Sequence, residues 1–281
     1  MIENLHYLID KSVLFALIVS VLIALCAGLL GVVLVLKRCS MIGDGLSHVA
    51  FGAYAVAIAM KLIDNMLLTI PVTIIIAILL LRVKSDGKIK GETLIAMLST
   101  GALALGYVVM NVSGGNNISG DVCSTLFGGA TILCLTVKDV IVTSVLSVVV
   151  FIIFFLFYNN FFAVTFDEGF AKAIGVKTEI YKLLLAITTA VVIVLSMELV
   201  GALLISALIV FPVISAMKLT GSFKGVIAIS LSIAGISAAV GVIAACLSDA
   251  PIGSTIVLVN MAFFIVTLLV SFVMSTAKSR N

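Results

Sequence analysis

The sequence predicts an all-α, polytopic membrane protein with about nine transmembrane helices. Of its 281 residues, 63% are hydrophobic and only 10% are charged, whereas soluble domains carry about 25% charged residues. The hydrophobic residues form long continuous runs, which indicate spanning helices and exclude the alternating pattern of a membrane barrel. A span takes about 20 residues, so no large domain outside the membrane fits. We therefore predict one transmembrane domain over residues 1–281.

Nine apolar runs are the candidate spans. In chain order they lie at 13–36, 46–63, 66–83, 94–111, 139–158, 181–199, 201–217, 225–247 and 254–275. The division of the long run 181–217 rests on the polar and glycine-containing stretch Glu198 to Gly201. If 181–217 is instead one span with a re-entrant piece, the number of spans falls to eight.

The basic residues predict how the runs are oriented, because cytoplasmic loops carry an excess of Lys and Arg. We assign the loops after the first, third, fifth and seventh runs, and the C-terminus, to the cytoplasm. This side then collects thirteen of the 16 basic residues: Lys37, Arg38, Arg82, Lys84, Lys88, Lys90, Lys172, Lys177, Lys182, Lys218, Lys224, Lys278 and Arg280. Only Lys11, Lys61 and Lys138 lie outside. We predict a cell-membrane protein with an external N-terminus and a cytoplasmic C-terminus.

Two connections are longer than simple turns. The polar segment 112–125 is rich in Gly, Ser and Asn, which predicts an external loop. The apolar stretch 126–137 that follows is too short to span, so we expect it to be interfacial or re-entrant. Residues 161–182 form the longest predicted cytoplasmic connection.

Asp44 and His48 form the most informative pair of polar residues. They are four positions apart, so on a helix they differ by about 40° in direction and about 6 Å in height. One carboxylate oxygen and one imidazole nitrogen can contact a divalent transition metal ion, and ionisable residues at membrane depth usually face a pathway or the bundle interior. The alternative is that Asp44 caps the second helix and His48 is a packed, hydrogen-bonded residue.

Glu198 is the other acidic residue in apolar surroundings. Three interpretations remain open: it completes a metal site, it carries a proton during transport, or it lies at the outer interface where the sixth and seventh runs divide. The sequence does not choose among them.

Residues 166–176 predict a short amphipathic helix between the fifth and sixth runs. Asp167 and Glu168 stand at its start and Lys172 further along, as the helix dipole favours. Phe170, Ala171 and Ile174 recur at helical spacing, and a glycine follows at 175. The segment is either an interfacial connector or a docking helix for a cytoplasmic partner.

Several function classes lack their sequence signatures. The chain contains no G-x-x-x-x-G-K-[ST] phosphate loop, no G-x-S-x-G nucleophile motif and no H-E-x-x-H metalloprotease pair. Its basic residues are explained by membrane topology, so nucleic-acid binding has no support. We expect a transport subunit without an ATPase site of its own, and no enzyme.

Five segments together resemble one family, the permease subunits of ABC-type manganese, zinc and iron importers, also called ABC-3 metal permeases. The matching segments are LVLKRCSMIGDGLSH at 34–48, TLFG at 125–128, FDEGFAKAIGV at 166–176, VGALLISALIV at 200–210 and PIGSTIV at 251–257. They follow the family's order and cover almost the whole chain. The sequence departs from the family at position 198, where Gln is frequent and Glu198 stands here.

The resemblance implies an ABC importer permease of the cobalamin-permease-like class. Two copies of the permease would form the pathway, two cytoplasmic ATPase subunits would drive it, and an external metal-binding protein would deliver Mn²⁺, Zn²⁺ or Fe²⁺. Asp44 and His48 match the family's acid–histidine pair, which is proposed to contact the ion. Asp167, Glu168, Phe170, Ala171 and Gly175 match the helix that docks on the ATPase. No permanently bound cofactor is expected.

Two other transport functions remain open at the level of sequence. A permease for iron chelates or a corrinoid vitamin needs a wide, uncharged pathway, and the Asp44–His48 pair argues against it. A secondary transporter would work without ATP or a partner protein, and the 166–176 helix argues against that.

Overall fold

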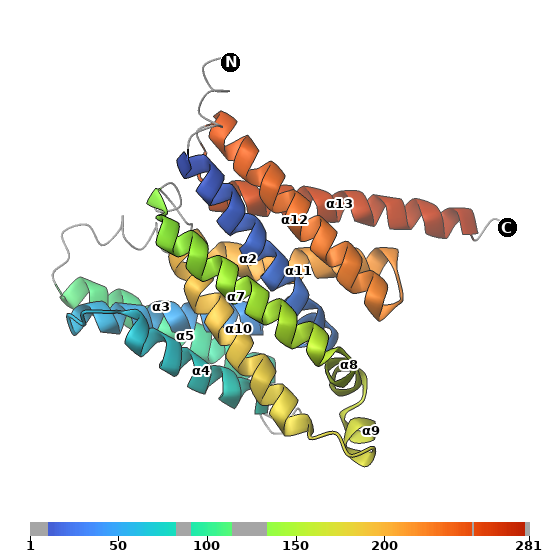
Figure 1. Ribbon diagram of the computed structural model, residues 1–281, viewed down its shortest axis with the longest axis horizontal. Helices are drawn as coiled ribbons and strands as arrows, with labels where there is room; N and C mark the ends of the chain where they lie inside the picture. The colour runs from blue at the N-terminus through green and yellow to red at the C-terminus, as the bar shows by residue number, and fades with distance from the viewer. Residues whose placement is uncertain (1–10, 83–90, 114–133, 249, 279–281) are drawn as a thin grey trace.

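The chain forms a bundle of helices, shown in Figure 1. The structure, a computed structural model, describes residues 11–82, 91–113, 134–248 and 250–278. The helices are α2 (Lys11–Leu36), α3 (Ile42–Ala59), α4 (Met66–Arg82), α5 (Gly91–Val112), α7 (Val137–Leu156), α8 (Tyr158–Phe166), α9 (Glu168–Ala173), α10 (Thr178–Val200), α11 (Ala202–Leu219), α12 (Phe223–Ser248) and α13 (Ile252–Lys278). No strand occurs in these ranges.

The nine predicted runs all correspond to helices. Eight helices in the described part of the chain are long and apolar enough to cross a membrane, and α4 is a shorter apolar helix of 17 residues. Helices of this kind satisfy their backbone hydrogen bonds internally, as a lipid environment requires. The all-α membrane fold is therefore confirmed.

The long run 181–217 is divided into two helices. Helix α10 ends at Val200 and α11 begins at Ala202. Gly201, between them, has a φ of +98°, a backbone conformation that side chains disfavour and glycine adopts readily. The predicted division of 181–217 into two helices near Glu198–Gly201 is therefore confirmed.

Helix α2 lies at the centre of the packing. It contacts α12, α11, α7, α10 and α8, and the diagonal helices α2, α7, α10 and α12 run in similar directions in Figure 1. Helices α3, α4 and α5 form a group beside them, and α3 also contacts α11 and α10. The helix that carries Asp44 and His48 is thus held from several sides.

Small residues let helix backbones approach closely, a common basis of helix packing in membranes. A Cβ added to Gly52 of α3 would lie 2.7 Å from the carbonyl oxygen of Ala102 in α5. A larger residue at this position would therefore push α3 away from α5.

Helices α8 and α9 lie together at one end of the bundle, beyond the end of α7 and before the start of α10 (Figure 1). We call this the α9 end. Helix α8 was not predicted from the sequence, which gave only a long connection there. Phe161 and Val164 are its buried residues, and Phe162 contacts Phe223 of α12 with ring centroids 5.2 Å apart.

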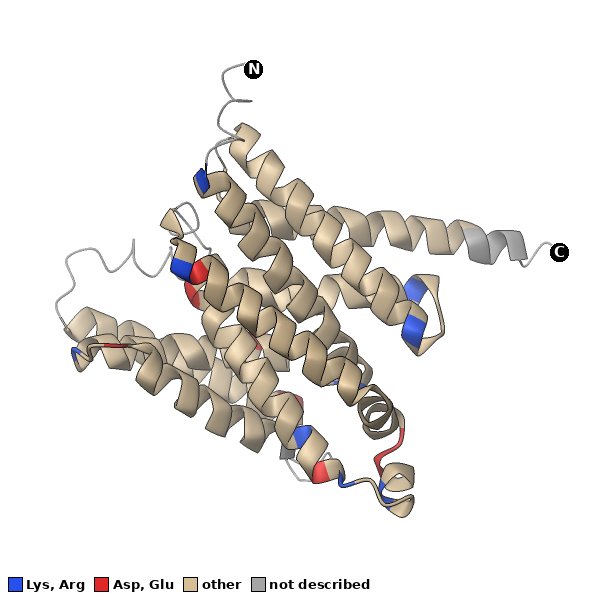
Figure 2. Cartoon of the chain, viewed as in Figure 1, with Lys and Arg blue, Asp and Glu red and all other residues tan. Residues whose placement is uncertain are grey.

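Figure 2 shows the charged residues at or near the ends of the helices, with few along their middles. The basic residues at the α9 end lie in the terminal turns of helices or directly beside them: Lys37, Arg38, Lys172, Lys177, Lys182, Lys218 and Lys224. Lys11, Lys61 and Lys138 stand at the other ends of α2, α3 and α7. The predicted grouping of these residues is thus consistent with the helix order, and the assignment of the α9 end to the cytoplasm stays a prediction.

Several sequence expectations fall outside the described residues. These are the basic residues at 84, 88, 90 and 280, the TLFG segment at 125–128, nearly all of the loop 112–125 and most of the stretch 126–137.

Candidate functional site

Asp44 and His48 lie together near the start of α3. The Nε2 atom of His48 is 3.6 Å from Oδ1 of Asp44, and their side chains are 15% and 37% exposed, respectively. Asp44 stands in the first turn, where a carboxylate is favoured by the helix dipole. The predicted juxtaposition of the two side chains is therefore confirmed.

The alternative role of Asp44 as a helix cap is wrong. The residue before α3 is Met41, which makes no side-chain capping hydrogen bond, and Asp44 is already inside the helix. The Asp44 carboxylate therefore does not cap the helix.

His48 has one ring nitrogen without a partner. Its Nδ1 atom is buried and accepts or donates no hydrogen bond among the described residues. A buried polar atom left without a partner costs about 1–3 kcal/mol. In the single chain, the Nδ1 atom of His48 can therefore still form a hydrogen bond or bind a ligand.

The geometry of the pair suits contact with one metal ion. Oxygen and nitrogen ligands lie about 2.1 Å from Zn²⁺, so two such atoms on the same ion are about 3–4 Å apart. The separation of 3.6 Å between His48 Nε2 and Asp44 Oδ1 falls in that range. Two donors from one chain can contact an ion without enclosing it.

Glu198 lies apart from this pair. Its side chain is exposed, two residues before the end of α10, whereas Asp44 and His48 lie in the first two turns of α3. Asp139 and Asp64 are near enough to Glu198 to act on it electrostatically. Among the described residues, no three His, Cys, Asp or Glu side chains form a group that could hold a metal ion.

Helix α9 is built by local signals at both ends. The Asp167 side chain accepts a hydrogen bond of 2.9 Å from the backbone N–H of Phe170, which caps the start of the helix. Gly175 has a φ of +87° just beyond its end, a conformation typical of a glycine stop. Ala171 is fully buried and fixes the inner face of the helix. The short helix predicted from 166–176 is therefore present, with the bounds Glu168–Ala173.

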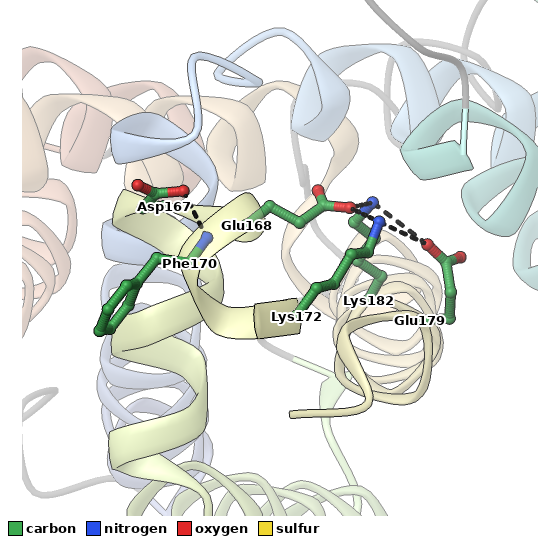
Figure 3. A network of polar contacts seen from close by, with 6 residues as sticks. All are labelled: Asp167, Glu168, Phe170, Lys172, Glu179 and Lys182. Atoms are coloured by element: carbon green, nitrogen blue, oxygen red, sulfur yellow. Dashed lines mark hydrogen bonds and ion pairs between the residues drawn. The ribbon is translucent and has the colours of Figure 1, made fainter. Parts of the chain in front are cut away.

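An ionic network holds α9 against the start of α10 (Figure 3). The Oε1 atom of Glu168 accepts hydrogen bonds from Lys172 Nζ at 2.8 Å and from Lys182 Nζ at 2.6 Å. Glu179 lies 3.5 Å from Lys182 and 4.0 Å from Lys172. The Glu168–Lys172 spacing was visible in the sequence, but the contact of Glu168 with Lys182, fourteen residues away, was missed.

The network controls the charge of its central carboxylate. Burial by itself raises the pKa of Glu168, but the hydrogen bonds and charges of Lys172 and Lys182 outweigh it and lower that pKa to about 2. Burial, together with the nearby Lys182 ammonium, lowers the pKa of Lys37 at the end of α2. The electrostatic contacts thus link α2, α9 and α10 at the α9 end.

The other side of α9 is apolar and open. Phe170 is 60% exposed and Ile174 is 57% exposed, and Phe166 just before the helix is similarly open. Figure 3 shows Phe170 pointing away from the charged cluster of Glu168, Lys172 and Lys182. Exposed apolar side chains that form a patch mark contact surfaces, so α9 offers a docking face.

Comparison with known proteins identifies related transporters. The chain is 28% identical over its whole length, and over 95% of the relative, to "Manganese import system permease protein ScaB" of Streptococcus parasanguinis. It is 25% identical to "High-affinity zinc uptake system membrane protein ZnuB" of Haemophilus influenzae, over 90% of this chain and 95% of that protein.

The fold is shared with a solved transporter. A chain of "PsaBC from Streptococcus pneumoniae in complex with Fab" superposes with a TM-score of 0.82 and 28% identity, covering 95% of both chains. The sequence model of the family described as "ABC 3 transport family" matches residues 10–271. Because that match covers nearly all of the sequence, the chain belongs to the ABC 3 transport family.

Proposed function

We propose that this chain is the membrane-spanning permease subunit of an ABC importer for Mn²⁺, Zn²⁺ or Fe²⁺, energised by separate ATPase subunits. The relatives named above for manganese import and zinc uptake support a divalent metal ion as the cargo. The observation that carries the proposal is the Asp44–His48 pair, with its oxygen and nitrogen 3.6 Å apart on a packed helix.

The pair is suited to transient contact with the cargo. A structural zinc site is closed by four protein ligands, whereas one copy of this chain offers two. Two copies, packed as a homodimer around the pathway, would offer two oxygen and two nitrogen donors. Without thiolates the site accepts Mn²⁺ and Fe²⁺ as well as Zn²⁺, and it releases the ion when the copies move apart.

Segment 161–182 supplies the coupling to ATP hydrolysis. The apolar face of Phe170 and Ile174 docks on the ATPase, and the Glu168–Lys182 contact passes the resulting force to α10. Because α10 contacts α3, a tilt of α10 alters the surroundings of Asp44 and His48. The site would then open alternately to the two sides of the membrane.

The opposite end of the bundle receives the ion. We assign that end to the outside, where a metal-binding solute-binding protein would dock. Glu198 lies there, with Asp64, Asp139 and Lys138 acting on it electrostatically. Three carboxylates against one ammonium leave an excess of negative charge, which would attract a cation towards the entrance. Glu198 would thus act before the Asp44–His48 pair and would not share its site.

The test is metal uptake into proteoliposomes that contain the permease with and without its ATPase and binding protein. We expect Mn²⁺, Zn²⁺ or Fe²⁺ to enter only when both partners and hydrolysable ATP are present. A nonhydrolysable ATP analogue serves as the control. Uptake that persists without ATP or partners would instead identify a secondary transporter.

A further inference from the structure

A groove on the outside of the bundle connects a polar pocket with an apolar channel. The pocket has a volume of about 410 Å³ and is lined by Tyr158, Asn159, Phe162, Ser222, Phe223 and Lys224. The channel has a volume of about 390 Å³ and is lined by Phe155, Tyr158, Lys224, Ile227, Ala228 and Leu231. Because Tyr158 and Lys224 line both, the two spaces are adjacent.

The groove lies where a membrane-spanning region meets the α9 end. Its walls come from the end of α7, from α8 and from the first turns of α12, and Tyr158 contacts Phe223 across it with ring centroids 5.5 Å apart. The apolar channel follows α12 towards the membrane interior. Phe155 on its α7 wall is 54% exposed, as expected of a side chain that faces lipid.

The polar pocket has the chemistry of a phosphate site. Among the described residues that line the pocket, Lys224 is the only charged one, and none of them is a carboxylate that would repel an anion. Ser222 accepts a hydrogen bond from the backbone N–H of Gly225. Its hydroxyl also lies 3.3 Å from that of Thr220, and either of the two can be the donor, so a bound anion would accept the proton of Ser222 when Thr220 donates. The first residues of α12, a helix of 26 residues, add the positive end of a helix dipole, which favours phosphate.

The order of polar and apolar surfaces matches that of a phospholipid. We propose that this groove binds an anionic phospholipid from the leaflet at the α9 end, with its phosphate at Lys224, Ser222 and Tyr158 and an acyl chain along Ile227, Ala228 and Leu231. A free phosphate ion would use the pocket but not the channel. A bound lipid would hold α8 against α12, directly before the helix that docks on the ATPase.

The proposal is tested by binding of phosphatidylglycerol to the purified full-length chain, measured by native mass spectrometry, with phosphatidylcholine as the neutral lipid. Lys224→Gln is expected to weaken phosphatidylglycerol binding about fivefold, the contribution of one lysine near an anionic lipid surface. Ala228→Trp fills the channel and is expected to weaken it at least as much. Lys218→Gln, an exposed lysine at the same end that does not line the groove, is the matched control and is expected to change binding less than twofold.

Three results would overturn the proposal. If Lys218→Gln and Lys224→Gln weaken phosphatidylglycerol binding equally and Ala228→Trp has no effect, the lipid is attracted by the positive surface in general and not by the groove. Displacement of the lipid by inorganic phosphate at millimolar concentration would show an ion site. A photoreactive residue at position 231 that crosslinks in membranes to a second copy of the chain, and not to lipid, would show a protein interface.

Discussion

Helices α3 and α9 each carry an acidic residue four positions before a basic one, yet the two pairs differ in how fully they are satisfied. Asp44 and His48 are 3.6 Å apart, and the buried Nδ1 of His48 has no partner among the described residues. Glu168 and Lys172 are 2.8 Å apart, and the same Glu168 oxygen also accepts a hydrogen bond from Lys182. The 3.6 Å separation is too long for a hydrogen bond, so Asp44 Oδ1 and His48 Nε2, the atoms that we propose contact the cargo, are not bonded to each other. Glu168, in contrast, is bonded to two lysines that fix α9 against α10.

This difference predicts different consequences of mutation in the two regions. Mutations of the α3 pair should change metal uptake. Mutations in α9 should change the association of the permease with its ATPase.

Phe170→Ser should reduce association of the ATPase with the permease at least tenfold. The reason is that Phe170 is the most exposed large apolar residue of α9, and buried aromatic anchors carry a large share of interface energy. Co-purification with the ATPase and binding measurements in detergent check this. Val137→Ser, which changes a similarly exposed residue at the other end of the bundle, is the control; equal losses in the two variants would remove α9 as the docking helix.

Glu168→Gln should have a smaller effect on the same association, about two- to fivefold. It keeps the shape of the side chain but removes the charge that holds Lys172 and Lys182, and partly exposed ion pairs contribute about 0.2–1 kcal/mol each. Glu179→Gln is the matched control, because its carboxylate lies farther from both lysines. If Glu179→Gln weakens association more than Glu168→Gln, the network does not position α9 as described.

The pH dependence of the network should be the smallest effect. The folded-state pKa of Glu168, about 2, lies below the ordinary value of 4.5. A lowered acidic pKa contributes stability that is present above pH 4.5 and is lost as the pH falls towards 2. The difference in thermal stability between the original chain and Glu168→Gln should therefore be constant from pH 7 to 5 and should shrink below pH 4.5. A difference that disappears already above pH 5 would contradict the ionic role of Glu168.

The sequence predicts most of the helices because each is an apolar run of nearly constant length. The division at Gly201 was also readable, since a glycine beside Glu198 interrupts the run. Helix α8 was missed for a physical reason. Its apolar residues extend the preceding run, and the two helices are separated by a change of backbone direction at Phe157, whose φ is −105° and ψ 19°.

In the two sites, only contacts between residues a few positions apart in sequence could be predicted. The four-residue interval predicted that Asp44 lies beside His48, and the acidic start of 166–176 predicted the short helix that carries Glu168 and Lys172. The contact of Glu168 with Lys182 depends on how α10 packs against α9, and no local sequence pattern predicts that packing. The same holds for Glu198: its sequence surroundings left a metal ligand, a proton carrier and an interfacial residue as possible roles, and the fold places it near the end of α10, away from the α3 pair.

The central claim is that α3 contacts the cargo and α9 couples the chain to ATP hydrolysis. It is tested most directly by measuring metal taken up per ATP hydrolysed in proteoliposomes that contain the ATPase, the binding protein and the His48→Ala permease. We expect uptake to fall at least tenfold while ATP hydrolysis stimulated by the binding protein stays within twofold of its original rate. Glu92→Gln, which removes an exposed carboxylate in the first turn of α5, should change neither quantity. Uptake at the original rate in His48→Ala, or uptake and hydrolysis that fall together, would contradict the account.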